Sequence, residues 1–241
     1  MRLFSGIESF GWPYDTKAIV ATLSHAPRRV GLEISNTTAF QRFLPTGPIA
    51  FLPFTPTKSS LVWSTKPALA AALTSADPAV LALMINAAFR LPPLSLRYLH
   101  NLILDNNAIT ATELQNEIEF RERSHSIEPH SAYSSLDIES SSVGIPPEGA
   151  EALPPLVSSI QLGSIASFPL RLNHADSYIG DTEQSSRTVL LGDAAHTIHP
   201  LAGQGLNMGL GDAQSLASCI HQTVITGGDI GEFLYFNIHI N

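Results

Sequence analysis

Asp193 stands at the end of an apolar run, and its carboxylate has the chemistry to accept hydrogen bonds from ligand hydroxyl groups. The run over 188–191 is rich in β-branched and leucine residues, which predicts a short buried strand. Gly192 ends that strand. Because open α/β sheets bind ligands beyond the carboxyl ends of their strands, we expect Asp193 to lie at a binding site.

A glycine-rich segment follows this turn. Gly203, Gly205 and Gly209 allow backbone to approach a ligand closely. A helix that starts near 203–206 would point free N–H groups and a partial positive charge at an anionic or electron-rich ligand. The same residues are also compatible with a strand, a glycine-rich loop and a packed helix that bind nothing. The residue pattern alone leaves both interpretations open.

The string over 192–209 is Gly-Asp-Ala-Ala-His-Thr-Ile-His-Pro-Leu-Ala-Gly-Gln-Gly-Leu-Asn-Met-Gly. It resembles the second flavin-contacting motif of the single-component FAD-dependent aromatic-ring monooxygenases, and is most similar to the branch that hydroxylates precursors of ubiquinone (coenzyme Q). The resemblance implies FAD as cofactor, with Asp193 on the ribityl chain and the 200–207 loop beside the flavin ring. The cofactor-binding residues that it implies are Gly192, Asp193, Pro200, Gly203, Gln204, Gly205, Leu206 and Asn207.

Two further stretches, 41–53 and 61–65, resemble the same family. In that family they belong to a middle-domain sheet that forms the floor of the substrate pocket. The resemblance implies a tentative substrate pocket at Phe43, Phe51 and Trp63. Ordinary sheet core is the alternative role for each residue, because strand alternation does not tell from sequence which face is buried.

Short runs of β-branched and aromatic residues, separated by Pro, Gly, Ser and Thr, predict an antiparallel sheet. The expected strands are 17–23, 38–45, 48–54 and 59–65, with a later strand pair in 158–172. The expected helices are 68–73, 79–89 with Asp77 as N-cap, 95–104 and 112–120. The fold class is thus α+β / α/β: an antiparallel substrate-binding sheet plus, by the resemblance, part of a Rossmann-like FAD-binding domain of the p-hydroxybenzoate hydroxylase type.

The expected organisation is a substrate domain over 1–172, then the C-terminal part of an FAD-binding domain over 173–230. Within the first domain, 121–155 loses periodicity and fills with Ser, Glu and Pro, which predicts a flexible surface insertion. In the second, Ala213, Leu216 and Ala217 begin an apolar helix face. The last residues, 231–241, are an atypical, nearly uncharged apolar tail.

Composition excludes several function classes. With 241 residues and 44% hydrophobic content, the chain can bury a core of one large or two small domains. A net charge of -8 and no basic stripe argue against nucleic acid as a partner. No apolar run suggests a membrane span, and the N-terminus does not resemble a signal or targeting segment. The single cysteine, Cys219, is expected to be a buried, inert thiol.

The remaining candidate side chains are histidines. His125 and His130 have no cysteine or carboxylate cluster at ligand spacing, so no metal site is expected. His196 and His199 flank the Gly-Asp turn, where a proton relay is conceivable, but a histidine satisfied by the local structure is the commoner case. No residue is therefore assigned as catalytic.

One part of the family pattern has no counterpart in this sequence. The family begins with a strand, a Gly-x-Gly-x-x-Gly turn and a helix that holds the FAD pyrophosphate. No such turn follows an apolar strand here, and the family's nicotinamide-side Asp-Gly motif is also absent. We expect the chain to correspond to a fragment without the N-terminal FAD-binding half.

The resemblance implies an FAD-dependent monooxygenase that hydroxylates the aromatic ring of a polyprenylated hydroxybenzoate-type precursor. It further implies a ferredoxin-type or nicotinamide electron donor, a multi-protein ubiquinone-biosynthesis complex, and peripheral attachment to the matrix side of the mitochondrial inner membrane. Two alternatives stay open. One is a truncated, non-catalytic remnant that is inactive or binds partners, and the other is a related ring hydroxylase that acts on a soluble phenol.

Overall fold

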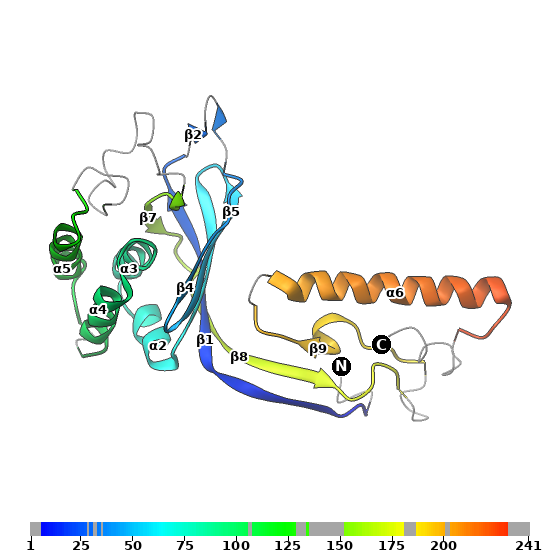
Figure 1. Ribbon diagram of the computed structural model, residues 1–241. Helices are drawn as coiled ribbons and strands as arrows, with labels where there is room; N and C mark the ends of the chain where they lie inside the picture. The colour runs from blue at the N-terminus through cyan, green and yellow to red at the C-terminus, as the bar shows by residue number, and fades with distance from the viewer. Residues whose placement is uncertain are drawn as a thin grey trace. The chain divides into compact units, whose positions relative to one another are not determined.

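The computed structural model describes residues 6–27, 29–30, 33–34, 36–105, 108–128, 134, 152–180, 187–200 and 203–230 (Figure 1). The chain forms two compact units, one of Asp15–Pro169 and one that combines Met1–Tyr14 with Leu170–Asn241. Strands β1 (Ser9–His25) and β8 (Ala166–Ala175) each continue from one unit into the other. The division into 1–172 and 173–230 stays a prediction, and the atypical tail lies outside the described residues.

An antiparallel sheet forms the centre of the Asp15–Pro169 unit. Its strands β4 (Phe40–Leu44), β5 (Gly47–Thr55) and β6 (Lys58–Thr65) pair in sequence, and β6 then pairs with β1. β7 (Val157–Ile160) also pairs with β1, and β2 (Arg29–Val30) with β3 (Glu33–Ile34) forms a separate ladder. The predicted strands are confirmed, and the later segment forms two strands, but β7 and β8 each pair with β1 and not with each other. β1 begins earlier than predicted, and its first residues gave no signal because they are exposed and lack alternation.

The turn between β4 and β5 requires glycine. Gly47 has φ +137°, a conformation that side-chain-bearing residues rarely adopt. A Cβ at this position would also collide with the carbonyl oxygen of Ser64 on β6. The close packing of these strands therefore depends on the missing side chain.

Four helices cover one face of this sheet (Figure 1). They are α2 (Pro67–Ser75), α3 (Pro78–Arg90), α4 (Pro93–Asp105) and α5 (Ala111–Ser124). The Asp77 side chain accepts a 2.8 Å hydrogen bond from the N–H of Ala79, which confirms the predicted N-cap. A capping box of Thr110 and Glu113 starts α5. All four predicted helices are confirmed.

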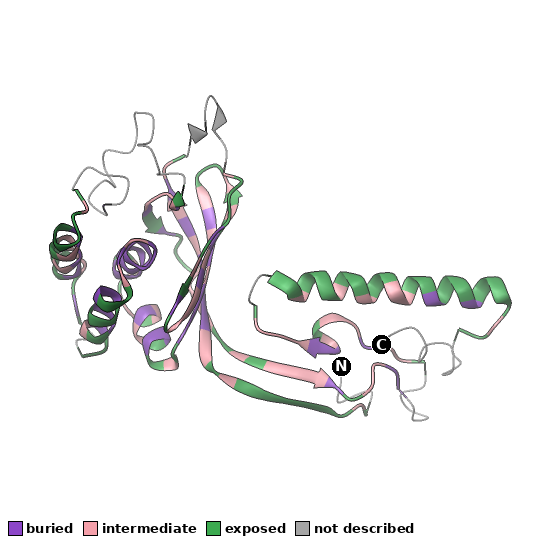
Figure 2. Ribbon diagram, in the orientation of Figure 1, coloured by how far each residue is buried: buried purple, intermediate pink, exposed green. Residues whose placement is uncertain are grey.

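The two faces of the sheet differ in burial, as Figure 2 shows. Phe51 opposes Phe40 and Leu61, and Trp63 opposes Ile49, so these residues share a face. That face packs against the helices and is fully buried at both Phe51 and Trp63. The opposite face leaves Phe43, Leu52 and Phe54 exposed. Only the helix-covered face is part of the hydrophobic core.

The predicted insertion over 121–155 begins too early. α5 continues to Ser124, because Arg121 pairs with Glu117 one turn before it and also donates to the Glu117 carbonyl. Beyond it, the Asn86 side chain bonds both the N–H and the carbonyl of Val157 and so fixes the start of β7. His130 and most of the predicted insertion, residues 129–133 and 135–151, lie outside the described residues.

The second unit contains β8, the short strand β9 (His196–Thr197), the 3-10 helix η3 (Gly192–Ala194) and the long helix α6 (Gln204–Thr226). The prediction of a strand over 188–191 is wrong. Val189 forms an isolated bridge to Ile179. Two hydrogen bonds flank the bridge, from the Gly180 N–H to the Thr188 carbonyl and from the Leu190 N–H to the Tyr178 carbonyl, and they do not extend into a ladder among the described residues. Among the described helices, none has the length and apolar character needed to cross a bilayer.

Candidate functional site

The Gly-Asp turn is built on a glycine with positive φ. Gly192 has φ +53° and opens η3, and its carbonyl accepts a 2.8 Å hydrogen bond from the N–H of Ala195. A residue with a Cβ would be strained in this conformation. The turn leaves the Asp193 side chain exposed, as expected for a carboxylate that receives a ligand.

Asp212 of α6 holds this turn in place, a role that sequence analysis did not identify. Its Oδ2 accepts a 2.8 Å hydrogen bond from the N–H of Gly192. The Nε2 of His196 lies 2.8 Å from the same oxygen. Since a carboxylate only accepts, this bond puts a proton on Nε2 of His196. The turn, β9 and the helix are thus joined through one carboxylate.

The environment of His196 favours a positioning role. His196 is buried, and its ring contacts that of Tyr178 at a centroid distance of 5.9 Å. The Tyr178 hydroxyl in turn lies 3.0 Å from Nε2 of His174. Burial, and secondarily the Asp212 charge, raises the pKa of Tyr178 above its ordinary value. His196 is therefore satisfied by a carboxylate inside a polar network, without access to solvent.

His199 occupies a different environment. Its ring contacts Tyr14 edge-on at 5.3 Å, and partial burial lowers its pKa. Its Nδ1 is buried and has no hydrogen-bond partner in the described structure. No role in catalysis is assigned to it on this geometry.

The N-terminus of α6 lies where the sequence predicts a helix start. Gly203 is the N-cap with φ +64°, and no side chain caps the helix. The first turn, with Gln204, Gly205, Leu206 and Asn207, contains no acidic residue. The first N–H groups of a helix have no intrahelical partner and carry partial positive charge, so this end of a 23-residue helix suits an electron-rich ligand.

The glycines of the motif separate into two kinds. A Cβ at Gly209 would lie 3.4 Å from the Cα of Gly192, so Gly209 lets α6 pack against the Gly-Asp turn. A Cβ at Gly203 or Gly205 would meet no atom within 4 Å. Gly209 thus has a structural explanation, whereas the space beside Gly203 and Gly205 is free for a ligand.

The packed face of α6 differs from the predicted one. Cys219 and Thr223 are buried and Leu216 is half-buried, while Ala213 and Ala217 are exposed. The reason is that Asp212 must point at Gly192, which turns the face that includes Leu216 and Cys219 inward. The predicted burial of Cys219 is confirmed. Figure 2 shows that most of α6 is exposed.

The three tentative substrate-pocket residues do not come together. Phe51 and Trp63 are 0% exposed in the core beneath the helices. Phe43 is 71% exposed on the opposite face, because it lies an odd number of residues from Phe40 along β4. A single pocket lined by all three residues is therefore wrong, and only Phe43 stays on a face open to a ligand.

The residues present suit part of an FAD molecule. Asp193 offers a carboxylate for ribityl hydroxyls, and the α6 N-terminus offers N–H groups for the electron-rich pyrimidine end of a flavin. The open space beside Gly205 admits a planar group. Among the described residues, no group of three His, Cys, Asp or Glu side chains is arranged to hold a metal ion.

Comparisons with known proteins point to the same cofactor class. A family model described as an FAD binding domain matches residues 154–229. The mitochondrial ubiquinone biosynthesis monooxygenase COQ6 of Xenopus tropicalis is 39% identical over 231 residues, which are 96% of this chain and 41% of that protein. COQ6 of Saccharomyces cerevisiae is 38% identical over 235 residues, covering 97% of this chain and 43% of that protein. The human protein of the same name is 36% identical over 231 residues.

Among solved structures, the crystal structure of PqsL, a probable FAD-dependent monooxygenase from Pseudomonas aeruginosa, is similar with a TM-score of 0.52. It is 18% identical and covers 95% of this chain and 44% of that chain, so the likeness concerns the fold. With the FAD-domain match, it confirms the predicted fold class. The chain spans about two fifths of the length of the curated relatives it matches.

Proposed function

On the premise that the chain is a sequence relative of the FAD-dependent ubiquinone biosynthesis monooxygenases, we propose that it contributes the substrate sheet and the second flavin-contacting segment of such an enzyme. The reaction is hydroxylation of the aromatic ring of a polyprenylated hydroxybenzoate-type precursor. A bound FAD supplies the activation of molecular oxygen that this hydroxylation needs. The observation that carries the proposal is the open helix N-terminus of α6 beside the Gly-Asp turn.

Each motif residue then has a defined task. The Asp193 carboxylate accepts hydrogen bonds from ribityl hydroxyls, because it is exposed at the end of the turn. The first turn of α6 stabilises negative charge on the pyrimidine end of a reduced flavin through its N–H groups. Gly203 and Gly205 leave the space into which the ring system fits.

Asp212 and His196 act on the flavin only through the protein. By bonding Gly192 and His196 with one oxygen, Asp212 fixes the direction in which the turn presents Asp193. Such support holds a binding group within the narrow range of productive geometry. We propose both residues as positioning residues.

The open face of the sheet is the surface we propose for the substrate. It presents the aromatic ring of Phe43, and Leu52 and Phe54 follow on β5. An apolar floor of this kind suits a phenol ring with an isoprenoid tail, and shields the reacting ring from water when covered. The buried Phe51 and Trp63 support this surface from behind.

The cellular setting is proposed from the relatives. They are described as mitochondrial ubiquinone biosynthesis proteins. We propose a mitochondrial location with peripheral attachment on the matrix side of the inner membrane, within a biosynthetic complex. The electron donor is of the ferredoxin or nicotinamide type.

Titration of the 241-residue chain with FAD, followed by flavin fluorescence, tests the proposal. We expect saturable binding that Asp193→Ala weakens by about 1 to 3 kcal/mol, the range for hydrogen bonds to a charged group. Asp176→Ala, which removes another exposed carboxylate of the same unit, is the matched control and should bind normally.

Three results would change the proposal. A folded chain that binds no FAD would overturn the flavin-binding role and favour the alternative of a non-catalytic, partner-binding protein. Equal loss of affinity in the Asp193 and Asp176 variants would remove the assigned role of Asp193. Substrate binding that does not depend on tail length would instead favour a soluble phenol.

A further inference from the structure

A cavity of about 360 Å³ lies in the Asp15–Pro169 unit, on the helix-covered side of the sheet. It is lined by the turn after β4, the start of α2, and α4, and it is open to solvent on one side. Its walls are mostly apolar, with Leu44, Leu69, Leu96 and Leu104 among the lining residues. This side of the sheet faces away from Phe43, so the cavity is separate from the substrate surface proposed above.

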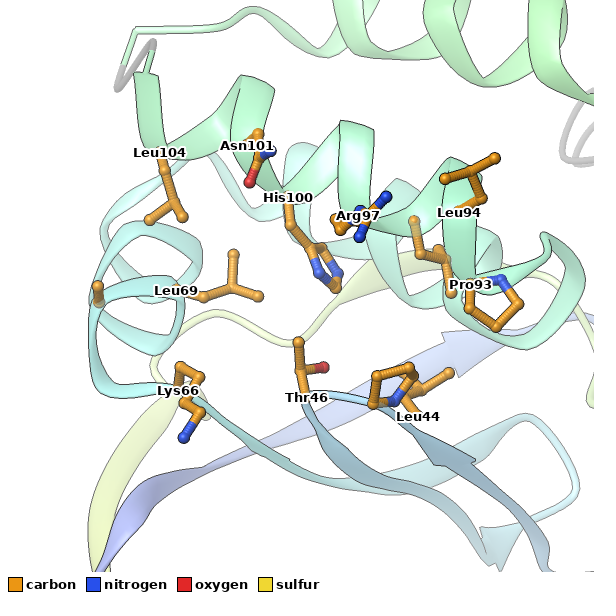
Figure 3. Close-up of a pocket in the computed structure, with 13 residues that line it drawn as sticks. Leu44, Thr46, Lys66, Leu69, Pro93, Leu94, Arg97, His100, Asn101 and Leu104 are labelled. Carbon is orange, nitrogen blue, oxygen red and sulfur yellow. The ribbon is translucent and has the colours of Figure 1, made fainter.

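His100 projects into this cavity from α4, as Figure 3 shows. The residue is 6% exposed, and its Nε2 is buried with no hydrogen-bond partner in the part of the chain that the structure describes. Burial lowers the pKa of His100 to about 4, so the imidazole is neutral at pH 7. A neutral imidazole nitrogen can donate to a carbonyl oxygen or accept from a hydroxyl, depending on its tautomer.

Two more buried polar atoms at this end of the sheet have no hydrogen-bond partner among the described residues. Thr46 Oγ1 belongs to the lining of the cavity, and Trp63 Nε1 belongs to the ring that contacts His100 at a centroid distance of 6.1 Å. Buried polar atoms are normally hydrogen-bonded, and leaving one unpaired costs about 1–3 kcal/mol. His100 and Thr46 both line the apolar cavity, and unpaired polar groups in an apolar cavity are typical of a ligand site.

The charges of the lining narrow the choice of ligand. None of the described residues that line the cavity carries a carboxylate. Lys66 is bonded to Asp15 at 2.9 Å, and Arg97 is exposed. The interior therefore offers neutral hydrogen-bonding groups, whereas the charges stay at the surface.

We propose that this cavity binds a neutral, apolar molecule that carries a carbonyl or hydroxyl oxygen, with His100 as its hydrogen-bonding partner and Thr46 as a second polar contact. The volume lies within the range of small-molecule sites. The inference does not depend on FAD binding, because all of its residues belong to the Asp15–Pro169 unit.

Trp63 provides the readout. The chain has two tryptophans, and Trp12→Phe leaves Trp63, next to His100, as the only one. Menadione is a neutral dicarbonyl probe that quenches tryptophan fluorescence, and it is titrated into the 241-residue Trp12→Phe chain without FAD. We expect saturable quenching that 2-nonanone, a colourless ketone, reverses by competition.

Matched variants locate the site. Ala68 and Ala71 are both exposed on α2, but only Ala68 lines the cavity. Ala68→Phe should abolish saturable quenching by filling the mouth of the cavity, and Ala71→Phe should leave it unchanged. His100→Phe keeps an aromatic ring but removes the nitrogen, so affinity should fall about three- to tenfold, as expected for a neutral hydrogen bond.

Quenching that rises linearly without saturation, or that persists in Ala68→Phe, would overturn the proposal and leave solvent as the only occupant of the cavity. Equal affinity in His100→Phe would overturn the role of His100. If His100→Phe does not fold, the Ala68 and Ala71 pair still decides the outcome, because both substitutions are at exposed positions.

Discussion

The two units of the chain differ in what holds them together. In the Asp15–Pro169 unit, one large cluster of buried apolar residues joins the sheet to four helices. In the other unit the buried clusters are small: Ala175, Leu190 and Ala195 form one, and Ile179 and Cys219 form another. There the bonds of Asp212 and the glycine contact between η3 and α6 supply much of the order. Apolar packing is thus extensive in the first unit, whereas the described part of the second unit combines small apolar clusters with hydrogen bonds.

This difference indicates which of the two units depends more on a bound ligand for its stability. Hydrophobic burial stabilises a unit without any ligand, at about 25 cal/mol per Å² of apolar surface. A unit with little burial has low local stability, as ligand-binding segments often do, and gains stability when a ligand binds. α6 exposes Leu206, Leu210, Val224 and Ile225. We infer that the second unit gains more order from FAD than the first.

The largest expected effect is in the packed unit. Phe51→Ala removes a fully buried ring from the core and should lower the free energy of unfolding by about 3–5 kcal/mol. Phe43→Ala is the control on the exposed face, and its effect should stay within about 0.5 kcal/mol. Urea unfolding followed by circular dichroism measures both. Equal effects would contradict the assignment of the two faces.

The next effect is a pH dependence of the packed unit. The folded-state pKa of His100 is about 4, below the ordinary value of 6.5, because burial disfavours its charged form. The unfolded chain therefore binds a proton first, and stability falls as pH decreases from about 6.5 to about 4, by roughly 3 kcal/mol at most. His100→Phe should reduce this pH dependence, whereas substitution of the exposed His221 should not, and the part that remains is expected from His25, whose pKa is also lowered by burial.

A smaller effect is expected in the polar network. Asp212→Ala removes the acceptor of both Gly192 and His196. It should lower the free energy of local opening of the turn by about 1–3 kcal/mol. Hydrogen exchange at the Gly192 amide measures it. Asp229→Ala breaks the exposed pair with Arg187 and should cost less than about 1 kcal/mol. Unchanged exchange at Gly192 would remove the proposed positioning role of Asp212.

The smallest effect on stability is expected at Gly205. The same substitution should have a large effect on FAD affinity. Gly205→Val meets open space, so thermal stability should change by no more than about 1 kcal/mol, the intrinsic helix-propensity scale. FAD affinity should nevertheless fall about tenfold or more, because a side chain blocks close approach. Gly209→Val should instead destabilise the packing of α6 on Gly192. If Gly205→Val binds FAD normally, the loop is only structural.

Local rules predicted the packed unit well. Alternation in β5 and β6, and Asp77-Pro78 at the start of α3, each act over a few residues, so the pattern is readable in the sequence. The sequence did not predict which face of the sheet Phe43 and Phe51 each occupy. They depend on which side the helices cover, which is a property of the tertiary structure.

The structure of the second unit was harder to predict from the sequence because its contacts are long-range. Asp212 lies twenty positions after Gly192, and nothing local distinguishes it from an exposed helix carboxylate. Residues 188–191 are of types that favour a strand, but among the described residues they form one isolated bridge, between Val189 and Ile179. The start of α6 was predicted correctly because Gly203 and the preceding loop mark it locally.

Hydrogen exchange of the 241-residue chain, measured with and without saturating FAD, tests most directly whether the Gly-Asp turn and the start of α6 bind the flavin. We expect slower exchange at Gly192 and at residues 204–207, and unchanged exchange in α3, which belongs to the packed unit. No protection at the turn and the α6 N-terminus, under conditions where FAD is bound, would contradict the assignment of these residues to the flavin.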